Sequence, residues 1–418
     1  MKDSGVEWIG EIPEDWDISK VRRGFRVSKT IAGDKANELP RLSLSNAGVL
    51  ERPKYDGFGV SPADYATYQI IPGGQFVFNF MGLEQDSLYR RVGISPMTGL
   101  VSAGYMEADY ISTQINPEYA YYFFRFMENG LLFKQYGSGI RSNLNKQQFH
   151  NMPFLFPPLD EQARISAVIK HKVEAIDTII SETQQSIDEL KKYKQALITE
   201  TVTKGLDKNV EMKDSGIEWI KKVPKSWEIK KTRFFLKEVS EKNYPNEEIL
   251  SLYRDYGVIP KNSRDDNHNV TSLDTSGYKL VNHNQLVINK MKAWQGSMAI
   301  SEIRGIISPA YYVYEVLDKQ IYTKFLHYAL RNNAYLDEYR RISAGLRIGQ
   351  WDLNKDLFKN VKIAFPSTMD EQRQIVDFLE EKIKWIDNIV IEKEQLLIQF
   401  EQLKQSLIYE YVTGKKEA

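Results

Sequence analysis

The sequence predicts an α+β protein built from two copies of one unit, each a globular domain followed by a long helix. An internal duplication, two heptad-patterned stretches and short β-rich runs between them predict this architecture. The 418 residues suffice for roughly two to four domains. The chain has no cysteine, which excludes a disulfide framework and a thiolate zinc site. Its 56 basic residues balance 56 acidic ones, which excludes a uniformly basic nucleic-acid coat.

The opening of the chain returns in its middle. Residues 1–23 and 212–234 are identical at 13 of 23 positions, including the sequence Asp-Ser-Gly-x-Glu-Trp-Ile. A second repeated segment begins with Asp-Glu-Gln at Asp160 and again at Asp370. The blocks between these markers are nearly equal in length, but their sequences have largely diverged. The repeats therefore predict two variable globular domains related by a pseudo-twofold axis.

Each segment that begins with Asp-Glu-Gln is predicted to form a long helix. Apolar residues recur in steps of three and four over about five heptads, which is the pattern of a coiled-coil seam. Prolines precede each helix, the Asp can cap its first amides, and Gly205 and Gly414 are suited to end it. The predicted seam residues are Ile165, Ile169, Val173, Ile176, Ile180, Ile187, Leu190, Leu197, Ile375, Leu379, Ile383, Ile386, Val390, Leu397, Phe400 and Leu407.

Neither helix can bury its apolar stripe alone. We expect the two helices to pair with each other as an antiparallel coiled coil, and the alternative is that each stripe packs on its own domain. Lys194, Lys393 and Lys404 lie at seam positions, where polar residues can fix the register. The predicted division is a first domain (1–159), a central helix (160–206), a second domain (207–369, with its repeat beginning at 212) and a C-terminal helix (370–414).

The variable blocks mix short β-rich runs with one clear helical stretch each. The runs 75–80, 285–289 and 310–316 alternate with Gly, Pro and Asn, whereas 117–126 and 321–332 have helical periodicity. Residues 1–150 carry 16 basic and 17 acidic groups, a net charge of −1, while residues 212–360 carry 24 and 18, a net charge of +6. Binding to phosphates, if it occurs, is therefore expected in the variable blocks, above all in the second.

Several segments of the variable blocks interleave cations, amides and aromatic residues. Arg paired to guanine and Asn or Gln paired to adenine are the bidentate readers of the DNA major groove. The candidate DNA-contacting residues are Arg90, Arg91, Arg141, Asn143, Asn145, Lys290, Lys292, Trp294, Gln295, Arg347 and Gln350.

Each of these segments could instead be an ordinary solvated loop, and Trp294 could be a core aromatic. The Gly-x-Arg at Gly139 recurs at Gly345 inside diverged blocks, and each copy is followed by Leu-Asn-Lys. This recurrence indicates that the Arg has the same role in both blocks. It could contact DNA, or it could fix a loop by binding a carboxylate or a carbonyl group.

No catalytic motif emerges from the sequence. The five histidines show no metal-site spacing, and there is no phosphate-binding Walker loop. The Gly137-Ser138-Gly139 triplet lacks the strand, helix and downstream acid of a dinucleotide site. We therefore expect a binding protein with no catalytic residue and no metal site of its own.

This combination resembles the DNA-specificity subunit of type I restriction-modification systems. The resemblance rests on the openings at Ser4–Trp16 and Ser215–Trp227, the two Gly-x-Arg elements, the Asp-Glu-Gln junctions that follow Pro157 and Pro366, and the two long helices, and it spans essentially the whole chain. It implies that each variable block is a target-recognition domain that reads one half of an interrupted, asymmetric DNA site. It also implies that the helices set the spacing of the half-sites and dock the modification subunits.

The same resemblance implies the partners. These are double-stranded DNA, two modification subunits that methylate adenine at N6 with S-adenosylmethionine, and possibly restriction subunits that use ATP and Mg. This chain would itself hold no cofactor. Because no apolar run approaches the roughly 18 residues of a membrane span and no secretory signal is present, we expect a cytoplasmic protein without membrane contact.

Two other functions are compatible with the sequence. A duplicated coiled-coil scaffold could recognise proteins or glycans through its two domains, and a nuclease or transferase could use an unrecognised site. The neutral net charge also indicates that this chain alone binds DNA weakly, so that partner subunits would supply phosphate contacts.

Overall fold

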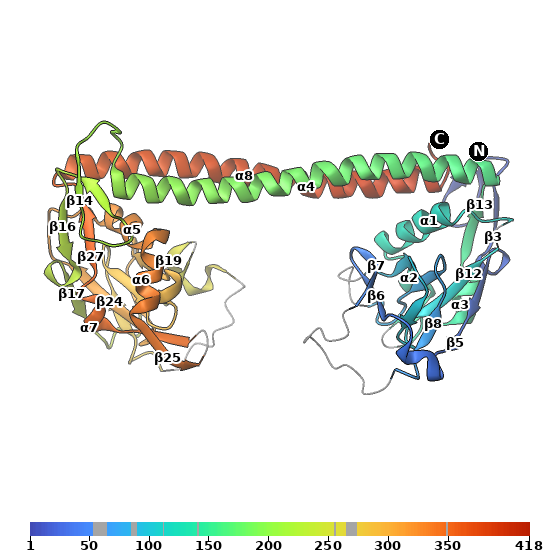
Figure 1. Ribbon diagram of the computed structural model, residues 1–418, viewed down its shortest axis with the longest axis horizontal. Coiled ribbons are helices and arrows are strands. Elements are labelled where there is room, and N and C mark those ends of the chain that lie inside the picture. The colour runs from blue at the N-terminus through green and yellow to red at the C-terminus, as the bar shows by residue number, and fades with distance from the viewer. Residues whose placement is uncertain are drawn as a thin grey trace. The chain divides into compact units, whose positions relative to one another are not determined.

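The computed structural model describes residues 1–52, 65–84, 90–111, 113–139, 142–254, 256–264, 274–347 and 350–418, with the main chain alone for Leu346, Arg347 and Gln350. The chain divides into two compact units. Unit 1 comprises Met1–Gln184 and Gln395–Ala418, and unit 2 comprises Gln185–Glu394. Each unit therefore holds one variable domain and one half of each long helix (Figure 1). Within the described ranges, no helix is both long and apolar enough to cross a membrane.

Unit 1 is built on antiparallel strands. In its described part, β10, β9, β12 and β4 form a sheet in that order, and β11, β8 and β5 form a second one. Its strands are β1 (Lys2–Asp3), β2 (Glu11–Ile12), β3 (Asp17–Lys20), β4 (Phe25–Ser28), β5 (Thr30–Ile31), β6 (Leu42–Ser45), β7 (Gly48–Glu51), β8 (Gln69–Ile71), β9 (Phe76–Phe78), β10 (Val92–Ile94), β11 (Gly99–Val101), β12 (Met106–Tyr110) and β13 (Pro153–Phe156). Its short helices are α1 (Pro117–Asn129), α2 (Phe133–Tyr136) and α3 (Lys146–Asn151).

Unit 2 repeats this topology. Its sheet has the order β17, β24, β21, β22, which matches β4, β12, β9, β10 of unit 1 strand for strand. The strands are β14 (Met212–Asp214), β15 (Lys222–Pro224), β16 (Glu228–Lys231), β17 (Leu236–Val239), β18 (Leu250–Tyr253), β19 (Gly257–Pro260), β20 (Lys279–Val281), β21 (Leu286–Asn289), β22 (Met298–Ile300), β23 (Gly305–Ile307), β24 (Tyr311–Val316), β25 (Ser343–Arg347), β26 (Gln350–Leu353) and β27 (Lys362–Phe365). The short helices are α5 (Thr323–Arg331), α6 (Leu336–Arg341) and α7 (Lys355–Phe358). The α+β prediction is confirmed, and the predicted β-rich runs contain β9, β21 and β24.

One short helix in each unit closes the core over the sheet. In unit 1, Asn116 caps α1 by accepting a hydrogen bond from the Tyr119 amide, and Pro117 starts the helix, as helix N-termini favour. The face of α1 that includes Phe123 and Phe124 is fully buried among the strand phenylalanines and the long helices. In unit 2, the face of α5 that includes Phe325 is buried in the same way.

The two long helices are α4 (Leu159–Lys204) and α8 (Met369–Val412). Each begins one residue earlier and ends two residues earlier than predicted. Gly205 and Gly414 follow the ends with φ of +76° and +69°, a left-handed conformation that ends helices and suits glycine. All sixteen predicted seam residues are buried or half-buried. Part of the alternative also holds, since residues such as Ile165 and Ile375 also pack into the core of their own domain.

An ion pair crosses the two helices in each unit. Lys404 Nζ lies 2.8 Å from Asp177 Oδ1 in unit 1, and Lys194 Nζ lies 2.6 Å from Asp387 Oδ1 in unit 2. The two pairs are copies of one another, because both partners are displaced by 210 positions. Unit 2 has a second pair, Lys191 with Glu394. From the first pair to the second, the residue number falls on α4 and rises on α8, so the helices run antiparallel within the unit. The expected antiparallel pairing is confirmed for the helix halves of each unit.

The repeated Asp-Glu-Gln fastens each long helix to the domain that precedes it. The glutamates accept hydrogen bonds from buried tryptophans, at 3.0 Å from Trp16 Nε1 to Glu161 and at 2.9 Å from Trp227 Nε1 to Glu371. The glutamine that follows each of them is buried and bonds to three main-chain groups of its unit. The motif is thus a joint that holds helix and domain together.

Candidate nucleic-acid interface

In unit 2, two segments of the candidate interface pack against each other. The turn between β21 and β22 contains Lys290–Gln295, and the hairpin β25–β26 contains the Gly-x-Arg element. Asn289 shapes the turn, since its side-chain oxygen accepts hydrogen bonds from the amides of Met291 (3.1 Å) and Lys292 (3.2 Å). The amide of Leu353 then donates to the Lys290 carbonyl at 2.9 Å, which joins the hairpin to the turn.

Aromatic side chains complete this contact. The rings of Trp294 and Trp351 lie 5.1 Å apart at 47°, and both side chains are half-exposed. Trp294 is therefore not the core aromatic that remained possible from the sequence. Its indole nitrogen donates to the Met291 carbonyl at 3.2 Å, which fixes the ring over the turn.

Unit 1 makes the same contact between a turn and a later segment, from homologous positions. Asn79 accepts a hydrogen bond from the Met81 amide at 3.3 Å, as Asn289 does from that of Met291. The Leu144 amide donates to the Phe80 carbonyl at 3.2 Å, which is the counterpart of the bond between Leu353 and Lys290. Two segments far apart in each repeat thus meet in both units, while the side chains that they display differ.

The candidates of unit 1 have differing environments. Arg90 is half-buried and donates to the Tyr121 hydroxyl at 2.9 Å and to the Asn46 carbonyl at 2.6 Å. Asn143 is exposed, and its side-chain oxygen accepts from the Gly82 amide at 2.8 Å. Arg141 lies outside the described residues.

Two candidates of unit 1 do not fit the role predicted for them. Arg91 is only 6% exposed, and its guanidinium donates to the carbonyls of Met81 (2.8 Å) and Gly82 (3.1 Å). Burial also lowers the pKa of this guanidinium. Asn145 caps α3 in a capping box with Gln148. The buried Arg91 therefore stabilises the loop at Met81 and Gly82, and Asn145 caps a helix, so neither side chain is presented to DNA as a base reader.

The candidates of unit 2 lie in or beside the turn and hairpin. Lys292 is exposed, Gln295 is half-exposed, and Lys290 donates to the Pro309 carbonyl at 2.8 Å. Arg347 and Gln350 face each other across the β25–β26 hairpin as a register pair, and only their main chain is described. The following Asn354 caps α7. Part of the recurrent Leu-Asn-Lys is thus explained by helix capping in both units.

Sequence reasoning missed three residues beside this interface. Tyr312 on β24 has Lys290 Nζ 4.8 Å and Lys279 Nζ 5.8 Å from its ring centre, and Lys355 starts α7 next to it. No motif in the sequence singles out Tyr312 or Lys279, and Lys355 belongs to the recurrent Leu-Asn-Lys, whereas the turn lysines Lys290 and Lys292 are already among the candidates.

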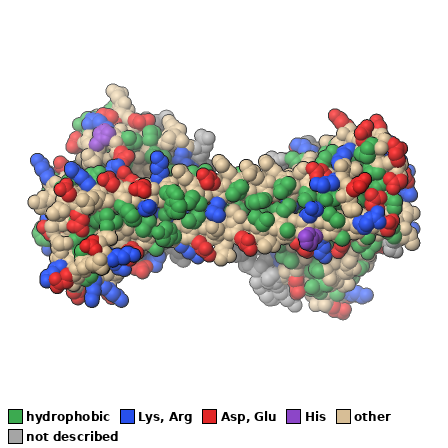
Figure 2. All heavy atoms as spheres, turned by 90° about the horizontal axis from the view of Figure 1, so that it is seen from above, with side chains coloured by type: hydrophobic (Ala, Val, Ile, Leu, Met, Phe, Trp, Pro, Cys, Tyr) green, Lys and Arg blue, Asp and Glu red, His purple; other side chains and the backbone are tan. Residues whose placement is uncertain are grey.

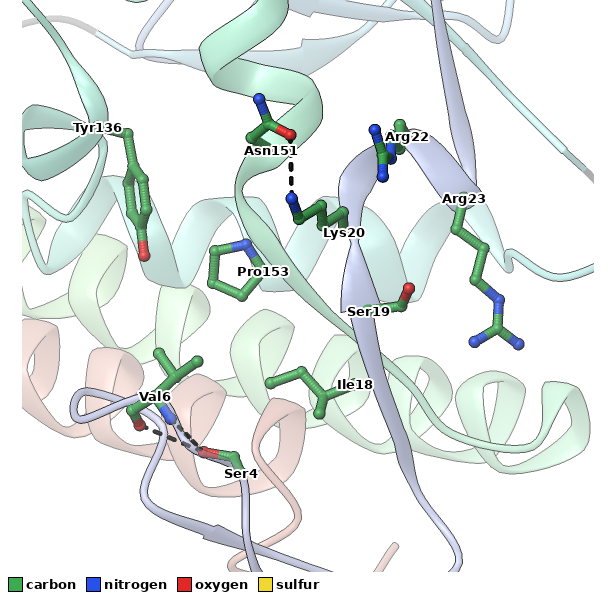
Figure 3. Close-up of a pocket in the computed structure, with 10 residues that line it drawn as sticks. All are labelled: Ser4, Val6, Ile18, Ser19, Lys20, Arg22, Arg23, Tyr136, Asn151 and Pro153. Atoms are coloured by element: carbon green, nitrogen blue, oxygen red, sulfur yellow. Dashed lines mark hydrogen bonds between the residues drawn. The ribbon is translucent and has the colours of Figure 1, made fainter.

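A separate hollow of about 890 Å³ opens beside the N-terminal motif of unit 1 (Figure 3). Two of its three basic side chains are engaged: Lys20 donates to Asn151 at 3.3 Å, and Arg23 pairs with Asp17. None of the candidate DNA-contacting residues lines it. The hollow lies where β3 pairs with β13, just before α4, and we assign it no part in base reading.

The fold and these surfaces define a class of protein: a duplicated recognition protein whose two variable domains are each held on an antiparallel helix pair. The type I restriction modification DNA specificity domain matches residues 99–192 and 224–401, which is more than half of the chain. The chain belongs to this family.

Curated relatives and solved structures agree with this assignment. The chain is 24% identical to the type I restriction enzyme MjaVIII specificity subunit of Methanocaldococcus jannaschii, over 97% of this chain and 93% of the relative. It is 21% identical to the putative type I restriction enzyme MjaX specificity subunit of the same organism, over 97% of this chain and 95% of that relative. A chain solved in work on the assembly and conformational transition of a type I restriction-modification system has the same fold, with a TM-score of 0.70, 14% identity and coverage of 97% and 100%. The HsdS subunit of Thermoanaerobacter tengcongensis matches with a TM-score of 0.54 and 15% identity, over 97% of this chain and 98% of that subunit.

Proposed function

We propose that this chain is the DNA-specificity subunit of a type I restriction-modification complex, and that its two domains read the two halves of an interrupted DNA site. The observation that carries the proposal is the contact between a turn and a later segment, which is repeated in both units. The scaffold residues are kept, as Asn79 and Asn289 show, whereas the positions beside them change from Phe80, which is buried, and Gly82 to Lys290 and Lys292. Different readers on one scaffold would give an asymmetric target.

The helix pair would set the spacing of the half-sites and dock the modification subunits. A twofold-symmetric protein on one face of a duplex places its half-sites about one helical turn apart, ~34–36 Å. Figure 2 shows apolar side chains gathered along the helices. In unit 1 the exposed ones include Ile179, Leu396, Ile398 and Leu403, and in unit 2 they include Tyr193, Trp385 and Ile391. Exposed apolar patches of this kind mark protein interfaces, and one patch per unit suits two copies of a helical partner.

The chemistry would belong to the partners. Modification subunits would bind S-adenosylmethionine and methylate adenine at N6, and restriction subunits, where they are present, would use ATP and Mg. In the part of the chain that the structure describes, no group of three or more His, Asp or Glu side chains is arranged to hold a metal ion. Under this proposal the chain contributes the choice of sequence and the geometry of the complex, and no catalytic residue.

Methylome sequencing tests the proposal directly. A methylation-deficient host would express this chain with its modification subunit, and a second host would express the modification subunit alone. We expect one interrupted, asymmetric N6-methyladenine motif that appears only with this chain. If no motif appears although the complex assembles and its methyltransferase is competent, the proposal fails, and a scaffold that recognises proteins or glycans becomes the better description.

A further inference from the structure

Lysines gather around one tyrosine beside the candidate interface of unit 2. Lys290 and Lys279 both approach the ring of Tyr312, and Lys355 lies close enough to act electrostatically on both Tyr312 and Lys279. Lys279 is only 7% exposed and donates to the Tyr311 carbonyl at 2.7 Å, whereas Lys290 is half-exposed. The cluster therefore has a buried cation at its base and a more accessible one at its rim.

Acidic groups neutralise this cluster incompletely. Asp352, Glu238 and Asp356 all act electrostatically on Tyr312, but Glu238 pairs with Lys355 at 3.1 Å and Asp356 pairs with Lys359 at 2.8 Å. Among the ion pairs of the described residues, neither Lys279 nor Lys290 has a carboxylate partner, and each donates to a carbonyl oxygen instead. Burial, followed by repulsion from Lys290, lowers the pKa of Lys279, although Glu238 acts in the opposite direction. An anion bound here would relieve that repulsion.

The homologous positions of unit 1 lack these cations. The strand registers align Lys279 with Gln69 on β8, and the turns align Lys290 with Phe80. The side-chain amide of Gln69 donates hydrogen bonds to the carbonyls of Ser102 (3.1 Å) and Tyr105 (2.5 Å), and Phe80 is buried in the core. A neutral amide and an apolar ring thus occupy the positions that carry two positive charges in unit 2. Only the third lysine has a basic counterpart, Lys146.

We propose that Lys290, with Lys279 behind it and Lys355 beside it, binds one phosphodiester of the DNA backbone, and that the first domain has no equivalent site. The inference rests on the proposed function, because the cluster adjoins the segments assigned there to base reading. A lysine ammonium is a compact point charge suited to a phosphate oxygen. Backbone contacts of this kind fix the position of a protein on DNA without specifying sequence. The second domain therefore contributes more of the salt-dependent affinity than the first.

The test measures DNA affinity against salt for the full chain assembled with its modification subunits. Each phosphate contact adds about 0.9 to the slope of log affinity against log salt. Raising the salt fourfold should therefore weaken binding about 3.5-fold more for the wild type than for Lys290→Met. Lys279→Gln, which introduces the residue of the first domain, should lower the slope in the same direction. Lys319→Met removes an exposed lysine elsewhere in unit 2 and should leave the slope unchanged.

Modified DNA identifies the source of the effect. A neutral methylphosphonate placed at each phosphate in turn should abolish the difference between the wild type and Lys290→Met at one position in the half-site read by the second domain. An unchanged slope for Lys290→Met, or an effect confined to the other half-site, overturns the inference. If Lys290→Met prevents assembly of the complex, and the slope measured for the full chain alone is unchanged, the cluster belongs to an interface with an acidic surface of a partner, which also overturns the inference. A wild-type complex with no sequence preference would instead refute the proposed function.

Discussion

Gln372, the buried glutamine at the start of α8, provides the sharpest test of how helix and domain are joined. Its side-chain oxygen accepts a hydrogen bond from the Tyr322 amide at 2.7 Å, and its amide nitrogen donates to the carbonyls of Gln320 (2.8 Å) and Pro366 (2.9 Å). Gln372→Leu would leave one buried N–H and two C=O groups without these partners. Each such group costs about 1–3 kcal/mol, with carbonyls at the lower end, for a total of about 4 kcal/mol. The additional apolar burial of Leu offsets about 1 kcal/mol.

We therefore expect Gln372→Leu to lower the free energy of unfolding of unit 2 by about 3 kcal/mol. Urea unfolding of the full chain, followed by hydrogen exchange and mass spectrometry, measures the loss and locates it in the peptides of unit 2. Gln374→Leu is the matched control, because Gln374 is exposed on the same helix two residues away. The reasoning is refuted if both variants cost the same, or if Gln372→Leu loosens unit 1 as much as unit 2.

Three further predictions concern the coiled coil and the core of unit 1. Inserting one heptad near Ser186 should lengthen the spacer between the half-sites and leave both half-site sequences unchanged in the methylome; an altered half-site with an unchanged spacer would contradict this. Asp177→Lys should destabilise unit 1 by about 1 kcal/mol by placing two lysines together, and adding Lys404→Asp should restore most of that loss in urea unfolding, since these partly exposed groups couple weakly. Glu107 is 2% exposed, and burial raises its pKa, so the stability it contributes is complete below about pH 4.5 and is lost as the pH rises through the raised pKa. Glu107→Gln should accordingly exceed the wild type in urea midpoint at pH 8 and lose that advantage near pH 4, whereas parallel pH curves would show that the carboxyl group is not responsible.

The sequence predicted the parts of the fold whose physical pattern is periodic. The seam of α4 and α8 could be read residue by residue, because a heptad places every third or fourth side chain on one face whatever the surroundings. The helices α1 and α5 were found for the same reason, and so were the strands β9, β21 and β24, which carry runs of apolar residues. The duplication then indicated that the second domain repeats the first.

The candidate site was harder to predict, because hydrogen bonding and burial there depend on segments distant in the sequence. Tyr89-Arg90-Arg91 reads as an exposed basic run, yet the guanidinium of Arg91 is buried against the carbonyls of the preceding loop. Asn145 is a candidate base reader by residue type, yet it caps α3, and Gln148 three residues later completes the capping box. Lys279 was overlooked because a lysine in a short strand is usually exposed.

The two units differ in how much of the chain must exist before each can close. Unit 2 is one continuous stretch, Gln185–Glu394, whereas unit 1 also needs Gln395–Ala418. The Tyr119 hydroxyl donates to the Val412 carbonyl at 3.1 Å, and Gly414 lies against Pro13 and Trp16 so closely that no side chain would fit. During synthesis on the ribosome, the first domain to emerge must therefore wait with part of its core uncovered, while the second domain can close before it.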